Sequence, residues 1–315
     1  MIRISLFGAS VTAQGKDSGY ITHLRDLCSQ HNIGLECFAY SACHFNDAGF
    51  FKADEVINSM ANVCFFDWNT TGMGEFDSNK LHYVLASLLN KDTLPVFLIF
   101  PRTDTNLLGD REAERQVISL SKNYNLPCLD LRNLIDQSVH LRDNVHTNRE
   151  GAILYAKAIF DFLFSGEIVC SPPTGLTKIS DYHPYRLSNF SIDSTISPHR
   201  SLRLRTVTSG LFPEIVLRVR VGPYSPVINI YYNEALVRSI NLFDQWCHFE
   251  REMYYAVLAP WQAVSDRAEV LIEVNADPPD RTITRDPGFE YNGSLFVPLI
   301  ECYTADIEVQ SLEYV

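Results

Sequence analysis

The sequence predicts an α/β domain built on a parallel sheet, followed by an antiparallel β-sandwich. In residues 1–165, short β-rich runs alternate with amphipathic helical stretches, which is the pattern of a parallel sheet covered by helices on both faces. After residue 200, short runs rich in Val, Ile and Tyr are broken by Pro, Gly, Asn and Asp. We therefore expect two domains, 1–165 and 201–315, joined by a linker over 166–200.

The first half of the α/β pattern begins with a predicted strand over 2–7. A helix follows it, in which apolar side chains recur at helical spacing and stop near Asn32 and Gly34. These side chains are Tyr20, Ile21, Leu24, Leu27 and Cys28. A second strand is predicted over 36–40.

Two later runs, 63–67 and 94–100, are almost continuously apolar, as expected of strands buried on both faces. Helices are predicted near 52–61, 79–90 and 109–124. A final helix is predicted to begin at Thr147, because residues 147–150 (Thr-Asn-Arg-Glu) match a capping box. Its buried stripe would consist of Ile153, Ala156, Phe160, Leu163 and Phe164.

The range 166–200 is rich in Ser, Pro, Thr and Asp and has no helical periodicity, which is typical of a linker or crossing segment. The sandwich strands are predicted beyond it, over 214–221, 227–232, 268–274, 295–302 and 306–314.

Composition limits the function classes. The 315 residues carry a formal net charge of −12, which argues against nucleic acid or an anionic membrane surface as the main partner. No apolar run approaches the ~20 residues of a membrane span, and the first residues do not form a secretory signal. The eight cysteines show no CxxC pair, so we expect reduced thiols, a cytoplasmic location, no metal site and no cofactor.

Three residues far apart in the sequence supply the groups that acyl transfer needs. Ser10 follows the first strand, and Asp143 and His146 precede the final helix. A serine hydroxyl becomes a nucleophile when an imidazole takes its proton and a carboxylate orients that imidazole. In a parallel sheet the loops at the carboxyl ends of the strands converge, so the three can meet there.

The motifs Gly8-Ala9-Ser10-Val11 and Asp143-x-x-His146, with an asparagine after the third strand, resemble those of the SGNH/GDSL hydrolases. The resemblance covers about residues 1–165. It implies a three-layer, flavodoxin-like domain in which Ser10 is the nucleophile, His146 the base and Asp143 its orienting acid. It also implies an oxyanion hole that combines the Ser10 N–H with an asparagine, best matched by Asn69, and a second loop donor.

Three positions depart from the family pattern. Ala9 replaces the aspartate of Gly-Asp-Ser, and residues 67–70 (Asp-Trp-Asn-Thr) replace Gly-x-Asn-Asp, so Thr70 or Thr71 could donate in place of Asn69. The loop after the second strand lacks the family's glycine, which places the second oxyanion donor within 43–45, with His44 as the candidate. His44 could instead contact substrate.

Three further residues are candidates for substrate binding. Phe45 lies in the same loop as His44, and Arg102 and Asp104 follow the strand 94–100 at the same sheet edge. Arg102 and Asp104 could position a polar substrate or form an ordinary surface pair.

The leading interpretation is a serine esterase that removes an O-acetyl or other small acyl group from a carbohydrate. One alternative is an O-acetyltransferase that uses the same triad on a sugar or surface polysaccharide. The other is a degenerate hydrolase whose sandwich binds carbohydrate or forms a homo-oligomer. Aromatic residues of the sandwich could stack on sugar rings or simply fill its core: Tyr224, Tyr231, Tyr232, Trp246, Tyr254, Tyr255 and Trp261.

Overall fold

The computed structural model describes residues 2–70, 74–104, 111–169, 185–211, 213–258, 267–286, 288, 291 and 293–315. The chain divides into two compact units, Met1–Pro184 and Tyr185–Val315. Among the described residues, no helix has the length and apolar character needed to span a bilayer.

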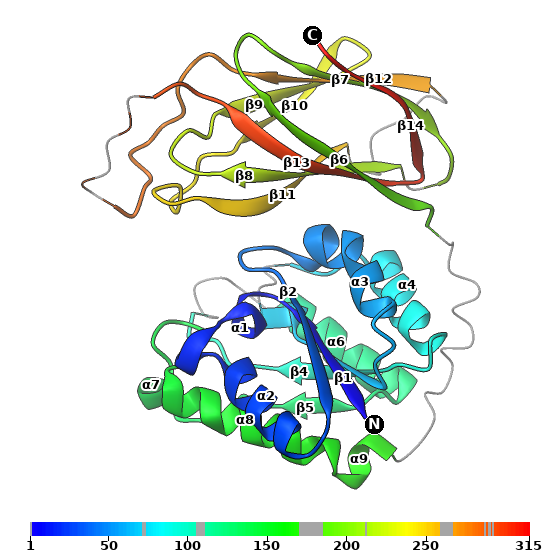
Figure 1. Ribbon diagram of the computed structural model, residues 1–315, viewed down its shortest axis with the longest axis vertical. Helices are drawn as coiled ribbons and strands as arrows, with labels where there is room; N and C mark the ends of the chain where they lie inside the picture. The colour runs from blue at the N-terminus through cyan, green and yellow to red at the C-terminus, as the bar shows by residue number, and fades with distance from the viewer. Residues whose placement is uncertain are drawn as a thin grey trace. The chain divides into compact units, whose positions relative to one another are not determined.

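The first unit is built on a parallel sheet with the strand order β2-β1-β3-β4-β5, the order of flavodoxin-like folds (Figure 1). The strands are β1 (Arg3–Gly8), β2 (Gly34–Ala39), β3 (Val63–Phe66), β4 (Leu94–Ile99) and β5 (Cys128–Asp130). The predicted fold class and its first four strands are confirmed. The sequence did not indicate β5, which has only three residues and is not fully buried.

Helices cover both faces of this sheet (Figure 1). On one face lie α2 (Tyr20–Gln30) and α8 (Arg149–Leu163), whose apolar side chains pack on β1, β3 and β4. On the other lie α3 (Ala53–Ile57), α4 (Ser78–Leu89) and α6 (Glu112–Tyr124). The shorter helical segments are α1 (Ser10–Ala13), η1 (Lys16–Ser18), η2 (Phe45–Gly49), η3 (Trp68–Thr70), α7 (Gln137–His140) and α9 (Gly166–Val169).

The start of α8 corrects one prediction. The residue that caps the helix is Asn148, whose side chain accepts a hydrogen bond from the Gly151 N–H. Thr147 does not form the predicted capping box, because its hydroxyl donates to the carbonyl oxygen of Ser18, 129 residues earlier. A tertiary contact has replaced the local one.

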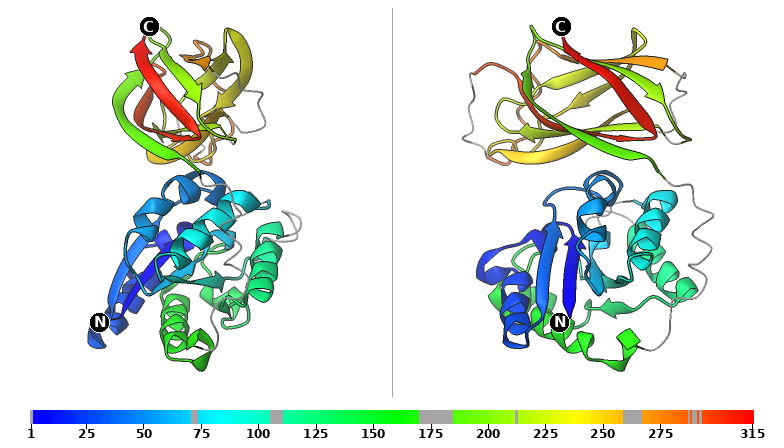
Figure 2. Two further views of the ribbon diagram at one scale, coloured as in Figure 1. Left: turned by 90° about the vertical axis from the view of Figure 1, so that its right-hand side faces the viewer. Right: turned by 45° about the vertical axis from the view of Figure 1, so that its right-hand side comes forward.

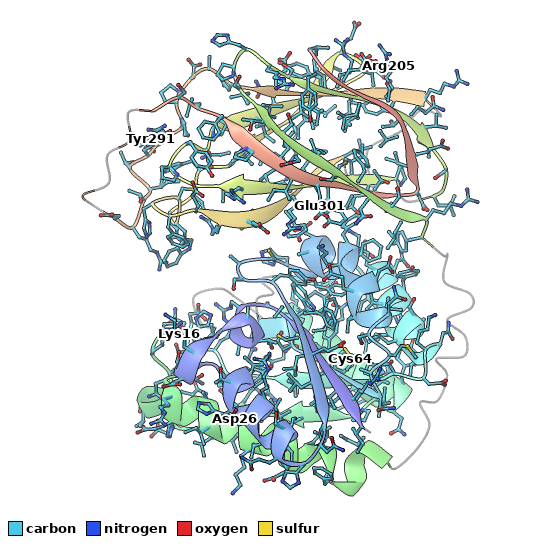
Figure 3. The ribbon with its side chains drawn as sticks, viewed as in Figure 1. Lys16, Asp26, Cys64, Arg205, Tyr291 and Glu301 are labelled. Atoms are coloured by element: carbon cyan, nitrogen blue, oxygen red, sulfur yellow. The ribbon has the colours of Figure 1, made fainter. Side chains whose placement is uncertain are left out.

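The second unit is a sandwich of two antiparallel sheets, as predicted (Figure 2). One sheet has the order β10-β9-β12-β7-β14 and the other β11-β8-β13-β6, with an apolar core made by both. The strands are β6 (Leu187–Ile196), β7 (Leu202–Thr208), β8 (Glu214–Val221), β9 (Val227–Tyr232), β10 (Ala235–Asn241), β11 (Arg251–Leu258), β12 (Arg267–Val274), β13 (Val297–Ala305) and β14 (Ile307–Tyr314).

Part of the range expected to be a linker is a strand. β6 occupies 187–196, pairs with β13 and forms the edge of its sheet. An edge strand that is largely exposed tolerates Ser, Asn and Asp, and its polar composition therefore resembles that of a loop. Residues 170–184 of the expected linker lie outside the described residues.

Candidate active site

The carboxyl ends of β1, β3 and β4 carry most of the residues expected to form the site. α1 begins with Ser10 directly after β1, and η3 with Asn69 follows β3. Arg102 and Asp104 follow β4. Parallel strands present their carboxyl ends on the same edge, so sheet topology gathers these segments.

Asp143 and His146 form the hydrogen-bonded pair of carboxylate and imidazole that their spacing predicts. The Nδ1 atom of His146 lies 2.9 Å from Oδ2 and 3.1 Å from Oδ1 of Asp143. The same carboxylate accepts hydrogen bonds from the N–H groups of Val145 and His146. Burial alone would raise the pKa of Asp143, but these hydrogen bonds outweigh it and hold the pKa below its ordinary value.

This geometry selects one tautomer of the imidazole. An ionised carboxylate can only accept, so Nδ1 of His146 carries a proton and donates it to Asp143. In the neutral ring, Nε2 then has the lone pair that can take a proton from a nucleophile. The His146 side chain remains 23 % exposed, so the ring is accessible.

Asn69 has the features of a donor reserved for a ligand. It is only 1 % exposed, and neither its amide nitrogen nor its amide oxygen has a hydrogen-bond partner among the described residues. A buried polar side chain without a partner is costly and rare, and a bound oxyanion would satisfy the amide N–H₂. The neighbouring Thr70 does not compete for this role, because its hydroxyl donates to the backbone oxygen of Asp67. The other alternative, Thr71, lies outside the described residues.

Asp67 connects the Ser10 segment to the Asn69 segment. Its Oδ1 accepts the N–H of Ala9 at 2.7 Å, one residue before Ser10, and its Oδ2 accepts the hydroxyl of Thr12. Its backbone oxygen accepts the N–H of Thr70 at 3.1 Å. A single residue therefore contacts both sides of Ser10 and the turn that contains Asn69.

Arg102 continues the connection from η3 toward the Asp143–His146 loop. Its Nη1 donates to the Thr70 carbonyl at 2.6 Å, while Nε and Nη2 bind both carboxylate oxygens of Asp104 at 2.8 and 2.7 Å. Asp104 in turn accepts from the Asn144 side chain at 3.2 Å, and the Thr103 N–H donates to the Asn144 carbonyl at 3.0 Å. The Arg102 hydrogen bonds hold the pKa of Asp104 below its ordinary value, against a smaller opposing effect of burial.

Two further hydrogen bonds join the loop before α8 to the segment that follows α1. Gln14, which follows α1, donates from Nε2 to the Thr147 carbonyl at 2.9 Å. The Thr147 hydroxyl donates to Ser18 at 2.9 Å. We call the closed path from Asp67 through Arg102, Asp104, Asn144, Thr147 and Gln14 back to α1 the contact ring. The ring links the segments that carry Ser10, Asn69 and His146.

The contact ring shows that Arg102 and Asp104 do not form an ordinary surface pair. Their side chains are only 16 % and 12 % exposed, and the pair is bound on both sides by backbone and side-chain partners. It is therefore an internal bridge between the Asn69 turn and the His146 loop rather than an ordinary surface pair.

Phe45, a candidate for substrate contact, lies in the buried core of the first unit. Phe45 is 0 % exposed, and its ring packs against Phe66, Trp68 and Phe76. An apolar ring surrounded by aromatic side chains in the core cannot reach a ligand. Its contact with Trp68 anchors the loop after β2 to η3, so its role is in packing.

His44 lies directly before η2 with an extended backbone and an exposed side chain. Its carbonyl accepts hydrogen bonds from Asp47 and Gly49, whereas its own N–H has no acceptor among the described residues. The role of His44 as an oxyanion donor stays a prediction.

Sequence reasoning missed Asp67 and Gln14 as parts of the site. Asp67 was read only as a departure from a motif, although a carboxylate directly after an apolar strand was a usable indication. Gln14 had no local signal, because its partner Thr147 is 133 residues away. Within the described residues, no group of three or more His, Cys, Asp or Glu side chains could hold a metal ion.

The sandwich aromatics divide into core and partly exposed residues. Tyr224 and Tyr254 are only 6 % and 7 % exposed, so core packing describes them. Trp246 is 37 % exposed and has the Arg285 guanidinium 4.0 Å from its ring centre. Tyr231, Tyr232 and Tyr255 are half-buried, and Trp261 lies outside the described residues.

No protein-family model matches the sequence, and no curated protein matches it significantly. Solved structures do match the fold. A two-domain esterase active on acetylated mannans aligns with a TM-score of 0.65 at 12 % identity, covering 98 % of this chain and 92 % of that one. A structure of such an esterase co-crystallised with mannopentaose gives a TM-score of 0.66 at 12 % identity, covering 97 % and 90 %.

A GDSL-like lipase from Bacteroides thetaiotaomicron covers 51 % of this chain and 87 % of its own, at 11 % identity and a TM-score of 0.41. The whole-chain matches show that this chain shares the two-domain fold of the matched esterase. The chain has a first unit with a flavodoxin-like parallel sheet, followed by a β-sandwich.

Proposed function

We propose that this protein is a serine esterase of the SGNH type that removes an O-acetyl or another small acyl group from a carbohydrate. The observation that carries the proposal is the Asp143–His146 pair on a loop that the contact ring ties to the segment bearing Ser10. A carboxylate, an imidazole and a serine in this order of roles constitute the machinery of acyl transfer.

In the proposed reaction, Ser10 attacks the ester carbonyl as Nε2 of His146 takes the hydroxyl proton. The oxyanion that forms is stabilised by the N–H of Ser10, the amide of Asn69 and the N–H of His44. His146 then gives its proton to the leaving alcohol, which completes the acyl-enzyme. Water attacks the acyl-enzyme with the same base, and the acid is released.

The carbohydrate part of the proposal is supported by the whole-chain fold match to an esterase active on acetylated mannans. The net charge of −12 favours an uncharged substrate over a polyanion, because like charges repel. The two-unit arrangement of the chain is also that of the matched esterase.

The proposal is tested by labelling the protein with a fluorophosphonate and mapping the modified peptide, in wild type and in Ser10→Ala. We expect modification at Ser10 in wild type and none in the variant. An unlabelled wild-type protein, or labelling that persists in Ser10→Ala, would contradict the assignment of the nucleophile.

A second measurement separates hydrolysis from transfer. Acetate release from acetylated mannan and from p-nitrophenyl acetate is followed with and without an unacetylated mannan acceptor. Hydrolysis predicts the same acetate yield in both cases. Acetyl groups that appear on the acceptor, with a matching loss of free acetate, would instead identify an O-acetyltransferase.

A further inference from the structure

Two departures from the family motifs occur on adjacent strands and concern the same chemical group. The aspartate of Gly-Asp-Ser is absent at Ala9, while an aspartate occupies the first position of the second motif at Asp67. Oδ1 of Asp67 accepts the N–H of Ala9 at 2.7 Å. The carboxylate missing beside the serine is thus supplied from the end of β3.

Asp67 is buried, and both of its carboxylate oxygens accept hydrogen bonds. It is 1 % exposed and also binds the Thr12 hydroxyl, which lies 2.6 Å from the hydroxyl of Tyr20 in α2. Because Ala9 and Thr12 flank Ser10, the carboxylate fixes both ends of the turn that presents the nucleophile. The main chain of Asp67 continues into η3, so the same residue fixes Asn69 two positions later.

Gly8 shows how closely this carboxylate approaches β1. A Cβ atom placed on Gly8 would lie 1.5 Å from Oδ1 of Asp67, so any side chain at position 8 would displace the carboxylate. The glycine of the Gly8-Ala9-Ser10 motif therefore makes room for Asp67.

We propose that Asp67 is a positioning residue of the esterase, which clamps the Ser10 helix to the Asn69 turn and sets the distance between nucleophile and oxyanion donor. This inference rests on the proposed function. Asp67 itself takes no part in bond making. It acts through the N–H of Ala9 and the hydroxyl of Thr12, which its two carboxylate oxygens accept.

Protonation would weaken the clamp, because one of the two carboxyl oxygens would then carry a proton and would no longer act only as an acceptor. Burial raises the pKa of Asp67 to about 6, against the lowering effect of its hydrogen bonds with Thr12 and Ala9. The described titratable groups that interact with it electrostatically are Tyr20 on α2 and Cys37 on β2. Burial raises both of their pKa values, that of Cys37 to about 12, so neither titrates between pH 4 and 9.

The test compares pH profiles of kcat and KM for wild type, Asp67→Asn and Thr12→Val. In wild type, protonation of Asp67 should lower kcat on the acidic limb of the profile in addition to any loss of the general base, so the limb of log kcat should be steeper than in a variant without this carboxylate. Asp67→Asn should lower kcat about 10- to 100-fold at neutral pH with little change in KM, and its acidic limb should have unit slope.

Thr12→Val tests the role of Asp67 independently if Asp67→Asn folds poorly. Loss of the Thr12 hydroxyl removes a hydrogen bond that lowers the pKa of Asp67. The acidic limb of this variant should therefore move to higher pH than in wild type. A merely structural role for Asp67 would lower the yield of folded protein without moving the limb.

Asp77→Asn is the matched control, because Asp77 also accepts backbone N–H groups at the start of a helix, α4. Its kcat profile should match that of wild type. An Asp67→Asn variant that keeps the wild-type kcat and limb would overturn the inference, although Ser10 would still label with fluorophosphonate. A wild-type protein that does not label at Ser10 would instead overturn the proposed function, and this inference with it.

Discussion

The two carboxylates of the candidate site lie in opposite environments. Asp143, on the loop before α8, is 49 % exposed in its side chain, and hydrogen bonds hold its pKa below the ordinary value despite partial burial. Asp67, at the end of β3, is 1 % exposed, and burial raises its pKa to about 6. The exposed carboxylate orients the imidazole that we propose as the base, whereas the buried one binds the backbone beside Ser10.

The contrast shows that a single residue type supports different tasks through solvation. Exposure keeps Asp143 ionised at little cost, and its hydrogen bonds then determine the tautomer of His146. Burial makes the charge of Asp67 expensive, so it is maintained only because N–H and O–H donors surround it. Substitutions at these two residues and at their partners separate the two roles.

Ser10→Ala and His146→Ala should each lower kcat by at least ~10⁴-fold, because each removes an atom that makes or breaks bonds. Steady-state hydrolysis of p-nitrophenyl acetate measures the loss, and circular dichroism checks that the fold is retained. Turnover close to that of wild type in either variant would refute the proposed triad.

Asp143→Asn should lower kcat by roughly 10²- to 10³-fold, since the amide cannot hold the correct tautomer of His146. The effect should be smaller than that of Ser10→Ala because the nucleophile and the base remain. Asp136→Asn is the control, since Asp136 makes the same kind of hydrogen bond to the backbone N–H of Ser138 at the start of α7. Equal losses of kcat in the two variants would show that Asp143 only stabilises the fold of its loop.

Arg102→Lys should lower kcat by about 10-fold, because one ammonium cannot replace three N–H bonds to Asp104 and Thr70. The variant tests whether Arg102 links the turn bound by Asp67 to the loop that carries Asp143. Arg132→Lys is the matched control, because Arg132 also binds an aspartate through Nε and Nη2. Its partner is Asp130, at the end of β5. If Arg102→Lys reacts at the wild-type rate, the contact ring does not position the site.

A further effect concerns stability against pH. The raised pKa of Asp67 penalises the folded state as pH rises from about 4 to 6, and a rise from 3.8 to about 6 corresponds to about 3 kcal/mol. Asp143, with its lowered pKa, contributes stability at neutral pH that is lost as pH falls below about 4.

Urea unfolding of wild type and Asp67→Asn at pH 4.5 and 7.5 measures this penalty. The free energy of unfolding of wild type should fall relative to that of the variant as pH rises between these values. A constant difference between the two proteins would mean that Asp67 does not titrate in this range.

The sequence alone was enough for features that depend on neighbouring residues. The apolar runs that became β3 and β4 are buried on both faces, and such runs are readable because every position along them faces a helix layer. The Asp143–His146 pair was also readable, since three residues of separation put a carboxylate within reach of an imidazole whatever the rest of the chain does.

Only the tertiary structure decided the features that join distant segments. Thr147 lost its expected capping role to a contact with Ser18, Phe45 became part of an aromatic core, and a polar edge strand formed where a linker was expected. Asp67 gained its role because β1 and β3 are neighbours in the sheet, which brings its carboxylate to Ala9 across 58 positions. Local sequence patterns report on the residue's own segment, whereas burial and hydrogen bonding at this site are set by segments that meet only after the chain has folded.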